Sequence, residues 1–243
     1  MIPFRTSAPA DSSPAVTMSL IVVNIAVFTL QLGMSHEESL RFLYTYALVP
    51  RFYSEPQLTY LFGLEPGNYL PFISNTFMHG GFLHIILNMW TLWLFGAPLE
   101  DRLGRWRFLL LYLASGLVGS IGHLTFNWDS PVPALGASGA IAGVLGAFTL
   151  TFPKARVLIV QPIFFFPLVL PLPALWYTGI WFAIQVWQGT SELGTQASQG
   201  GGIAWWAHIG GFGAGLLAAW LLAPRTPPPP PREPGPWELR LRE

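Results

Sequence analysis

The sequence predicts an all-α membrane protein, a single bundle of six transmembrane helices with a long first loop that lies in the membrane interface. Charged residues make up only 10% of the 243-residue chain, and hydrophobic residues make up 52%. An ordinary soluble domain holds about 25% charged residues. Six apolar segments, separated by charges or turn-forming residues, are long enough to form helices that cross or nearly cross a bilayer.

Six segments are expected to be helical, and their approximate bounds in chain order are 16–32, 77–98, 106–126, 138–153, 174–188 and 204–223. The polar leader before the first segment has neither a basic n-region nor an Ala-x-Ala cleavage site. We therefore expect a spanning helix there and not a signal peptide. The fourth segment is too short to span alone, so the loop before it must dip into the membrane, either beside a water-filled cavity or buried in protein.

Four connecting regions complete the expected organisation. Residues 33–74 mix aromatic residues with Pro and Glu, which is typical of a structure in the membrane interface. The apolar stretch 157–173 contains four prolines, so a regular helix is expected only from Ala174 onward. We expect residues 189–202 to form a mobile loop and the Pro-rich tail to be extended. The predicted divisions are a leader at 1–15, a membrane domain at 16–223 and a tail at 224–243.

The composition also excludes several classes of function. A net charge of zero argues against a nucleic-acid partner. The chain has no cysteine, so disulfides, thiol catalysis and thiolate metal sites are excluded. Asp and Glu fall only in the predicted leader, loops and tail. Zinc and aspartyl proteases of the membrane need buried carboxylates, so neither chemistry is expected, and we predict no metal.

Basic residues predict the orientation of the bundle. Six spans place both termini on one side, and ten of the twelve Arg and Lys residues fall on that side. Only Arg41 and Arg51 fall on the other side. The positive-inside rule then predicts that both termini lie in the cytoplasm. The expected location is the inner membrane of the cell.

Three polar side chains are expected at one depth. His84 precedes Glu100 by 16 residues and Ser138 precedes Lys154 by 16, while His208 precedes Arg225 by 17. At 1.5 Å per residue, each lies roughly 24 to 26 Å above the cytoplasmic boundary, about 5 Å below the outer surface. A hydroxyl, an imidazole and a second imidazole in one layer indicate a common site.

The chemistry at the start of the fourth helix points to peptide hydrolysis. Ser138 opens a helix whose first N–H groups have no partner within it, so they can stabilise an oxyanion formed on an attacked carbonyl. His208 is the candidate general base that takes the Ser138 proton. His84 and Asn88 share one helix face and are candidate donors to the oxyanion.

Three short motifs, in their order along the chain, resemble the signatures of rhomboid intramembrane serine proteases. They are Gly136-Ala137-Ser138-Gly139, the segment from Ala207 to Gly211 with Gly215 one turn on, and Phe77-Met78-His79 followed by His84 and Asn88. The resemblance covers roughly residues 17–222 and implies a six-helix rhomboid-like bundle. It also implies transmembrane protein substrates, cut near the extracytoplasmic face.

The resemblance assigns roles to the residues of these motifs. Ser138 would be the nucleophile and His208 the base, and the oxyanion hole would comprise His84, Asn88 and the Ser138 backbone N–H. One departure matters, because some family members stack an aromatic residue on the base four positions after the serine, where this chain has Ala142. Another group must therefore hold the His208 ring.

Several alternative interpretations stay open at this point. Small residues near the site let helices pack closely, which is the main role expected of Gly139, Gly143, Gly146, Gly211 and Gly215. Gly136 is a further structural glycine expected near the site. His79 is interpreted as structural. A rhomboid-like protein that binds membrane clients without cleaving them is the alternative function, and a small transporter is a third. The lipid bilayer is the other expected partner.

Overall fold

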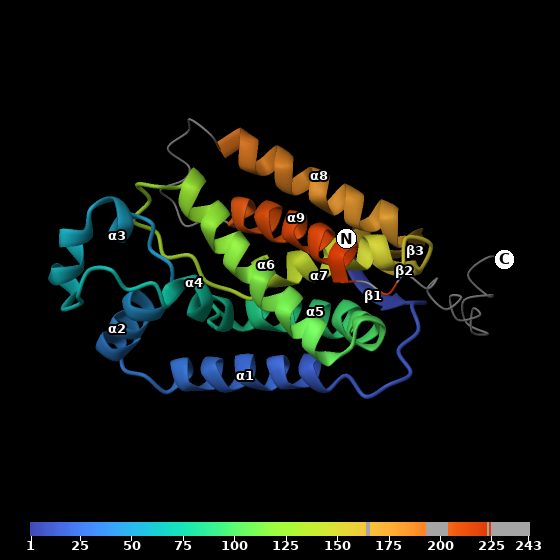
Figure 1. The fold of residues 1–243 in the computed structure, drawn as a ribbon, viewed down its shortest axis with the longest axis horizontal. Helices are drawn as coiled ribbons and strands as arrows, with labels where there is room; N and C mark the ends of the chain where they lie inside the picture. Colours follow the sequence, from blue (N-terminus) through green and yellow to red (C-terminus); the bar gives the residue numbers. More distant parts are fainter. Residues whose placement is uncertain (164–165, 193–203, 223, 225–243) are drawn as a thin grey trace.

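The computed structural model describes residues 1–163, 166–192, 204–222 and 224, with side chains left undescribed at 162–167. Within these residues, six helices of 14 residues or more form one bundle (Figure 1). They are α1 (Ala15–Leu32), α5 (Phe82–Leu103), α6 (Arg105–Phe126), α7 (Ser138–Thr151), α8 (Ala174–Glu192) and α9 (Trp205–Leu222). Four of them, α1, α5, α6 and α9, are long and apolar enough to cross a membrane.

The predicted helices are confirmed as helices, with ends that differ by a few residues. The largest difference is in α5, which begins at Phe82 and runs through Pro98 to Leu103. Helix α8 starts at Ala174 as expected but continues to Glu192, so the first residues of the predicted 189–202 loop are helical. Most of that loop, and nearly all of the tail, lie outside the described residues.

The short helix α7 lies at the centre of the bundle, packed against α5, α6, α8 and α9 (Figure 1). Its sequence consists of small and apolar residues, and almost every one of them is buried. Because Gly, Ala and Ser side chains are small, neighbouring helix backbones can approach α7 closely. The central position explains how a helix of only 14 residues can carry a polar group into the protein interior.

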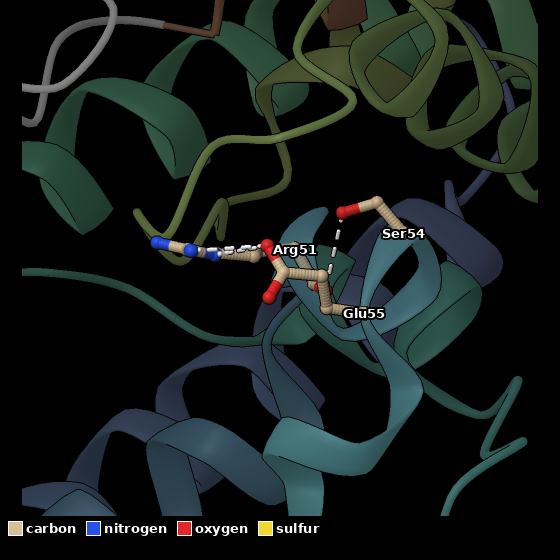
Figure 2. Close-up of polar contacts among 3 residues, drawn as sticks. All are labelled: Arg51, Ser54 and Glu55. Atoms are coloured by element: carbon tan, nitrogen blue, oxygen red, sulfur yellow. Dashed lines mark hydrogen bonds and ion pairs between the residues drawn. The ribbon is translucent and has the colours of Figure 1, made fainter.

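The long first connection folds into short helices: α2 (His36–Tyr46), α3 (Arg51–Ser54), η1 (Pro56–Phe62), α4 (Pro71–Ser74) and η2 (Asn75–Phe77). A capping box between Ser35 and Glu38 starts α2. In α3, Arg51 forms an ion pair of 3.0 Å with Glu55, and the Ser54 hydroxyl donates to the Arg51 carbonyl (Figure 2). The position of this region in the membrane interface stays a prediction.

A three-stranded antiparallel sheet corrects the all-α prediction. It has the order β1-β2-β3 and comprises β1 (Ile2–Thr6), β2 (Arg156–Ile163) and β3 (Phe166–Pro173). The leader supplies β1, so the residues before α1 pack onto the body of the protein. Three of the prolines that exclude a helix lie on β3, an edge strand, where a missing N–H donor is tolerated.

The start of helix α1 contacts the buried carboxylate of Glu100, a residue expected in a loop from the sequence. Glu100, in the last turn of α5, is only 2% exposed. Its two oxygens accept from the backbone N–H groups of Val16 and Thr17 at 2.9 and 2.7 Å, and from the Thr17 hydroxyl at 2.8 Å. Glu100 therefore caps α1, since the first N–H groups of a helix have no partner within it and favour a negative charge.

Candidate active site

The Ser138 hydroxyl and the His208 imidazole lie within hydrogen-bonding distance. Ser138 is the first residue of α7 and His208 lies in the first turn of α9, and Ser138 Oγ is 2.8 Å from His208 Nε2. His208 is buried, while Ser138 is partly exposed. The structure thus brings together the two candidate residues that are 70 positions apart in the chain.

Glycines bring the two helices close enough for this contact. A methyl group at Gly211 of α9 would overlap the carbonyl oxygen of Gly139, and one at Gly215 would overlap that of Gly143. Any larger residue at these positions would force α7 and α9 apart. The packing role predicted for Gly139, Gly211 and Gly215 agrees with these contacts.

The other ring nitrogen of His208 faces a side chain of α8. Gln185 Oε1 lies 2.7 Å from His208 Nδ1. The Trp181 ring lies one helical turn earlier on α8, with its centroid 5.7 Å from that of His208. Gln185 and Trp181 therefore contact the His208 ring. The position four residues after Ser138, where an aromatic side chain could stack on this ring, is occupied by Ala142. The sequence analysis did not identify Gln185 as a site residue. A side-chain amide within an apolar segment nevertheless indicates a polar group that needs a hydrogen-bond partner.

His84 points toward the serine across Gly136. Gly136 has a φ of 127°, which favours glycine. A methyl group there would lie 2.8 Å from both Cε1 and Nε2 of His84 and 3.7 Å from Ser138 Oγ. The Gly80 N–H donates to His84 Nδ1 at 3.4 Å, which leaves the hydrogen on Nε2, the nitrogen that faces Gly136. His84 can therefore donate a hydrogen bond into the space beside Ser138.

Asn88 is buried one helical turn after His84 on α5. In the described part of the chain its amide makes no hydrogen bond to Ser138 or His208. The structure places its helix next to the site without joining the side chain to the pair. Its assignment to an oxyanion hole remains a prediction.

His79 lies beside His84 but makes no polar contact through its ring. It is 1% exposed, and neither of its ring nitrogens has a hydrogen-bond partner among the described residues. The two imidazoles meet edge to face with centroids 5.1 Å apart. Burial lowers the pKa of His79 to about 4, so its ring is neutral at physiological pH.

A small cavity with several polar side chains in its lining adjoins Ser138. Its volume is about 20 Å³, and its lining includes Ser138, Gly136, Asn75, Ser120 and His123. The Asn75 amide donates to the Ser120 hydroxyl at 2.9 Å within this lining. A polar cavity of this size has room for about one water molecule. That solvent reaches the Ser138 hydroxyl through this cavity stays a prediction.

Comparison with known proteins shows what the chain resembles. The Rhomboid domain family model matches residues 66–225. Mitochondrial rhomboid protein 1 of Saccharomyces cerevisiae is 32% identical over 209 residues, which cover 84% of this chain and 52% of the yeast protein. Rhomboid protease GluP of Bacillus subtilis is 42% identical over 84 residues, which cover 35% of this chain and 16% of GluP.

A third relative has a different kind of name. The human presenilin-associated rhomboid-like protein, mitochondrial, is 34% identical over 101 residues, which cover 40% of this chain and 26% of the human protein. The chain thus spans about half the length of the yeast relative and smaller parts of the other two. The matched region of the family model includes α5 to α9 and so contains all the candidate site residues.

Proposed function

Because this chain belongs to the rhomboid family, we propose that it is an intramembrane serine endopeptidase that cleaves transmembrane-helix protein substrates. The observation that carries the proposal is the 2.8 Å contact between Ser138 Oγ and His208 Nε2. A serine hydroxyl is a weak nucleophile by itself, and an adjacent base within hydrogen-bonding reach activates it. Chemistry of this kind needs no cofactor.

The proposed reaction begins when His208 Nε2 removes the proton from Ser138 Oγ as this oxygen attacks the substrate carbonyl carbon. The carbonyl oxygen becomes an oxyanion. His208 then gives the proton to the leaving amine, and the peptide bond breaks to leave an acyl group on Ser138. A water molecule, deprotonated by His208, then attacks the ester carbon. His208 returns this proton to Ser138 Oγ as the acyl–oxygen bond breaks, which releases the carboxyl product and restores the Ser138 hydroxyl.

Three groups are proposed to stabilise the oxyanion. The Ser138 backbone N–H lies at the start of α7, where the helix dipole favours negative charge. His84 Nε2 faces the same space across Gly136. Asn88 is the third proposed donor, on the strength of its burial and its place one turn after His84. Each donor of this kind is worth about 10²- to 10³-fold in kcat.

The setting in the membrane is part of the proposal. The protein is a membrane protein with several apolar helices. We propose that α7 and α8 complete six spans, with both termini in the cytoplasm and the inner cell membrane as the location. Ten of twelve basic residues then lie on the cytoplasmic side. Ser138 lies near the extracytoplasmic face, so substrates are cut near that face.

A client-binding protein without protease activity is the alternative. Such a protein has no need of a hydroxyl and an imidazole in contact. This chain keeps both residues and holds them 2.8 Å apart, which favours the protease.

The test is cleavage of a transmembrane test substrate in proteoliposomes. Ser138→Ala and His208→Ala are each expected to abolish cleavage without loss of the fold. Ser115→Ala is the matched control, because Ser115 is fully buried in α6 and its hydroxyl has no hydrogen-bond partner among the described residues. Cleavage by Ser138→Ala at the wild-type rate would refute the proposed nucleophile. Substrate binding without cleavage in the wild type would favour the client-binding alternative.

A further inference from the structure

We propose that Gln185 is a positioning residue that fixes the protonation pattern and the orientation of the His208 ring. The inference rests on the proposed function, because it concerns how the base is prepared to accept the Ser138 proton. Gln185 lies on α8, whereas the base lies on α9 and the hydroxyl on α7. Three helices thus contribute to one line of hydrogen bonds.

The line of hydrogen bonds can be followed from α8 to α7. The Gln185 side-chain amide nitrogen donates to the Trp181 carbonyl oxygen at 3.1 Å. Gln185 Oε1 faces His208 Nδ1 at 2.7 Å. His208 Nε2 faces Ser138 Oγ at 2.8 Å.

The donor and acceptor of each hydrogen bond can be assigned in turn, starting from the Trp181 carbonyl oxygen. A backbone carbonyl only accepts, so the Gln185 atom facing Trp181 must be the NH₂ group. The atom facing His208 is then the amide oxygen, which also only accepts, so the hydrogen of the neutral imidazole must be on Nδ1. His208 Nε2 is left with a lone pair directed at Ser138 Oγ. A lone pair at this atom is what a general base for the serine requires.

Burial makes this arrangement energetically important. Gln185 is 4% exposed and His208 is 7% exposed, so water competes weakly for either group. A buried donor or acceptor that loses its partner is not compensated by water, so the loss is destabilising. The tautomer with its hydrogen on Nε2 would set two lone pairs, those of Nδ1 and Oε1, against each other. The neutral ring is therefore held in the tautomer that can accept the Ser138 proton.

No other described side chain does the same work. Trp181 and Trp205 lie beside the ring, with centroids 5.7 and 6.3 Å from that of His208, but they make no hydrogen bond to it. Ala142 is too small to stack on the ring. In serine hydrolases with a third residue, a carboxylate holds the base through the nitrogen remote from the serine. Gln185 occupies the corresponding place with a neutral oxygen.

The test compares three variants in proteoliposomes. Gln185→Met keeps the length of the side chain and removes the acceptor, so kcat is expected to fall about 10- to 100-fold with little change in KM. Gln185→Glu keeps an acceptor at the same place and is expected to retain kcat within about tenfold of wild type. Its carboxylate also favours the protonated ring, so the acidic limb of the kcat profile is expected at higher pH.

Thr178→Val is the matched control. Thr178 is fully buried on the same helix and hydrogen-bonds to Thr149 of α7, not to His208. It should lower the thermal unfolding temperature while kcat stays within about twofold of wild type. A loss of kcat in Thr178→Val equal to that in Gln185→Met would mean that any damage to α8 packing suffices, and would overturn the positioning role.

Nitrogen NMR of histidine-labelled protein tests the proposal in the wild type, without a substitution at Gln185. The His208 resonances, assigned by their absence in His208→Ala, should show a protonated Nδ1 and an unprotonated Nε2. A hydrogen on Nε2 in the neutral ring would overturn the inference, as would full kcat in Gln185→Met. Failure of the proposed function gives a different pattern, since either the wild type would not cleave the substrate or cleavage would persist in Ser138→Ala.

Discussion

Replacing Gly211 with alanine should separate the serine from its base. The added methyl group would overlap the Gly139 carbonyl oxygen, which is backbone and has no rotamer to escape into. Restoring an ordinary contact of about 3.4 Å requires the two helices to move apart by more than 1 Å at this level. Gly139 directly follows Ser138, and Gly211 lies one turn after His208, so the shift acts on both reacting groups.

The size of the effect follows from that shift. A displacement of about 1 Å lengthens the 2.8 Å contact between Ser138 Oγ and His208 Nε2 beyond the range of a hydrogen bond. Misplacement of a reacting group by about 1 Å costs on the order of 10²-fold in rate. We therefore predict that Gly211→Ala lowers kcat about 100-fold or more.

The assay is cleavage of a transmembrane test substrate, read together with thermal unfolding in detergent. Gly213→Ala is the matched control, because it lies on the same helix and its added methyl meets no atom within 4 Å. It should leave kcat unchanged and stabilise α9 slightly, since alanine is the better helix former by about 1 kcal/mol. Wild-type kcat in Gly211→Ala, or an equal loss in Gly213→Ala, would refute the reasoning.

Three further predictions concern the α1 cap, the buried His79 and the proposed oxyanion donors. Glu100→Gln leaves at least one N–H at the start of α1 without a partner, which costs about 2 kcal/mol. The thermal unfolding temperature should therefore fall by roughly 4 to 8 °C. An unchanged unfolding temperature would contradict the capping role. Burial holds the pKa of His79 at about 4 against 6.5 in the unfolded chain, so the unfolded state binds more protons and stability declines as pH falls from about 6.5 toward 4. His79→Phe should weaken this decline, and identical curves for variant and wild type between pH 7.5 and 5 would argue against it. His84→Ala and Asn88→Ala should each lower kcat about 100- to 1000-fold with normal folding, and no loss in either would mean that the oxyanion is stabilised by other groups.

Much of the bundle could be predicted because apolar segments and helix lengths are local properties of the chain. The segment from Arg105 to Phe126, for example, was expected to begin one residue later than it does. Polar residues in apolar surroundings were equally informative, since Ser138 and His208 were expected in one layer and lie in contact. Counting residues to the next charge predicts their common depth, whereas the contact itself depends on the packing of α7 against α9.

The sheet and the α1 cap could not be predicted by the same reasoning. Strand β1 pairs with β2 across about 150 residues of sequence, and the leader carries no periodic pattern that specifies this partner. Glu100 looks like the first charge after a span, whereas α5 continues past Pro98 and buries it. Both features depend on contacts between segments distant in the chain, which local hydropathy does not reveal.

The role of Gln185 could be predicted only in part from the sequence. Its position in an apolar helix signalled a buried amide in need of a partner. The partner itself became visible only when α8 and α9 were placed side by side, with Oε1 against His208 Nδ1.

Reaction with a fluorophosphonate probe tests the proposed nucleophile most directly. Such a probe forms a covalent bond with an activated serine oxygen, and mass spectrometry of the labelled protein identifies the residue. We predict a single adduct on Ser138 that disappears in His208→Ala and persists in Ser115→Ala. An adduct on a different serine, or labelling of Ser138 that is unchanged in His208→Ala, would contradict the proposal that these two residues act together.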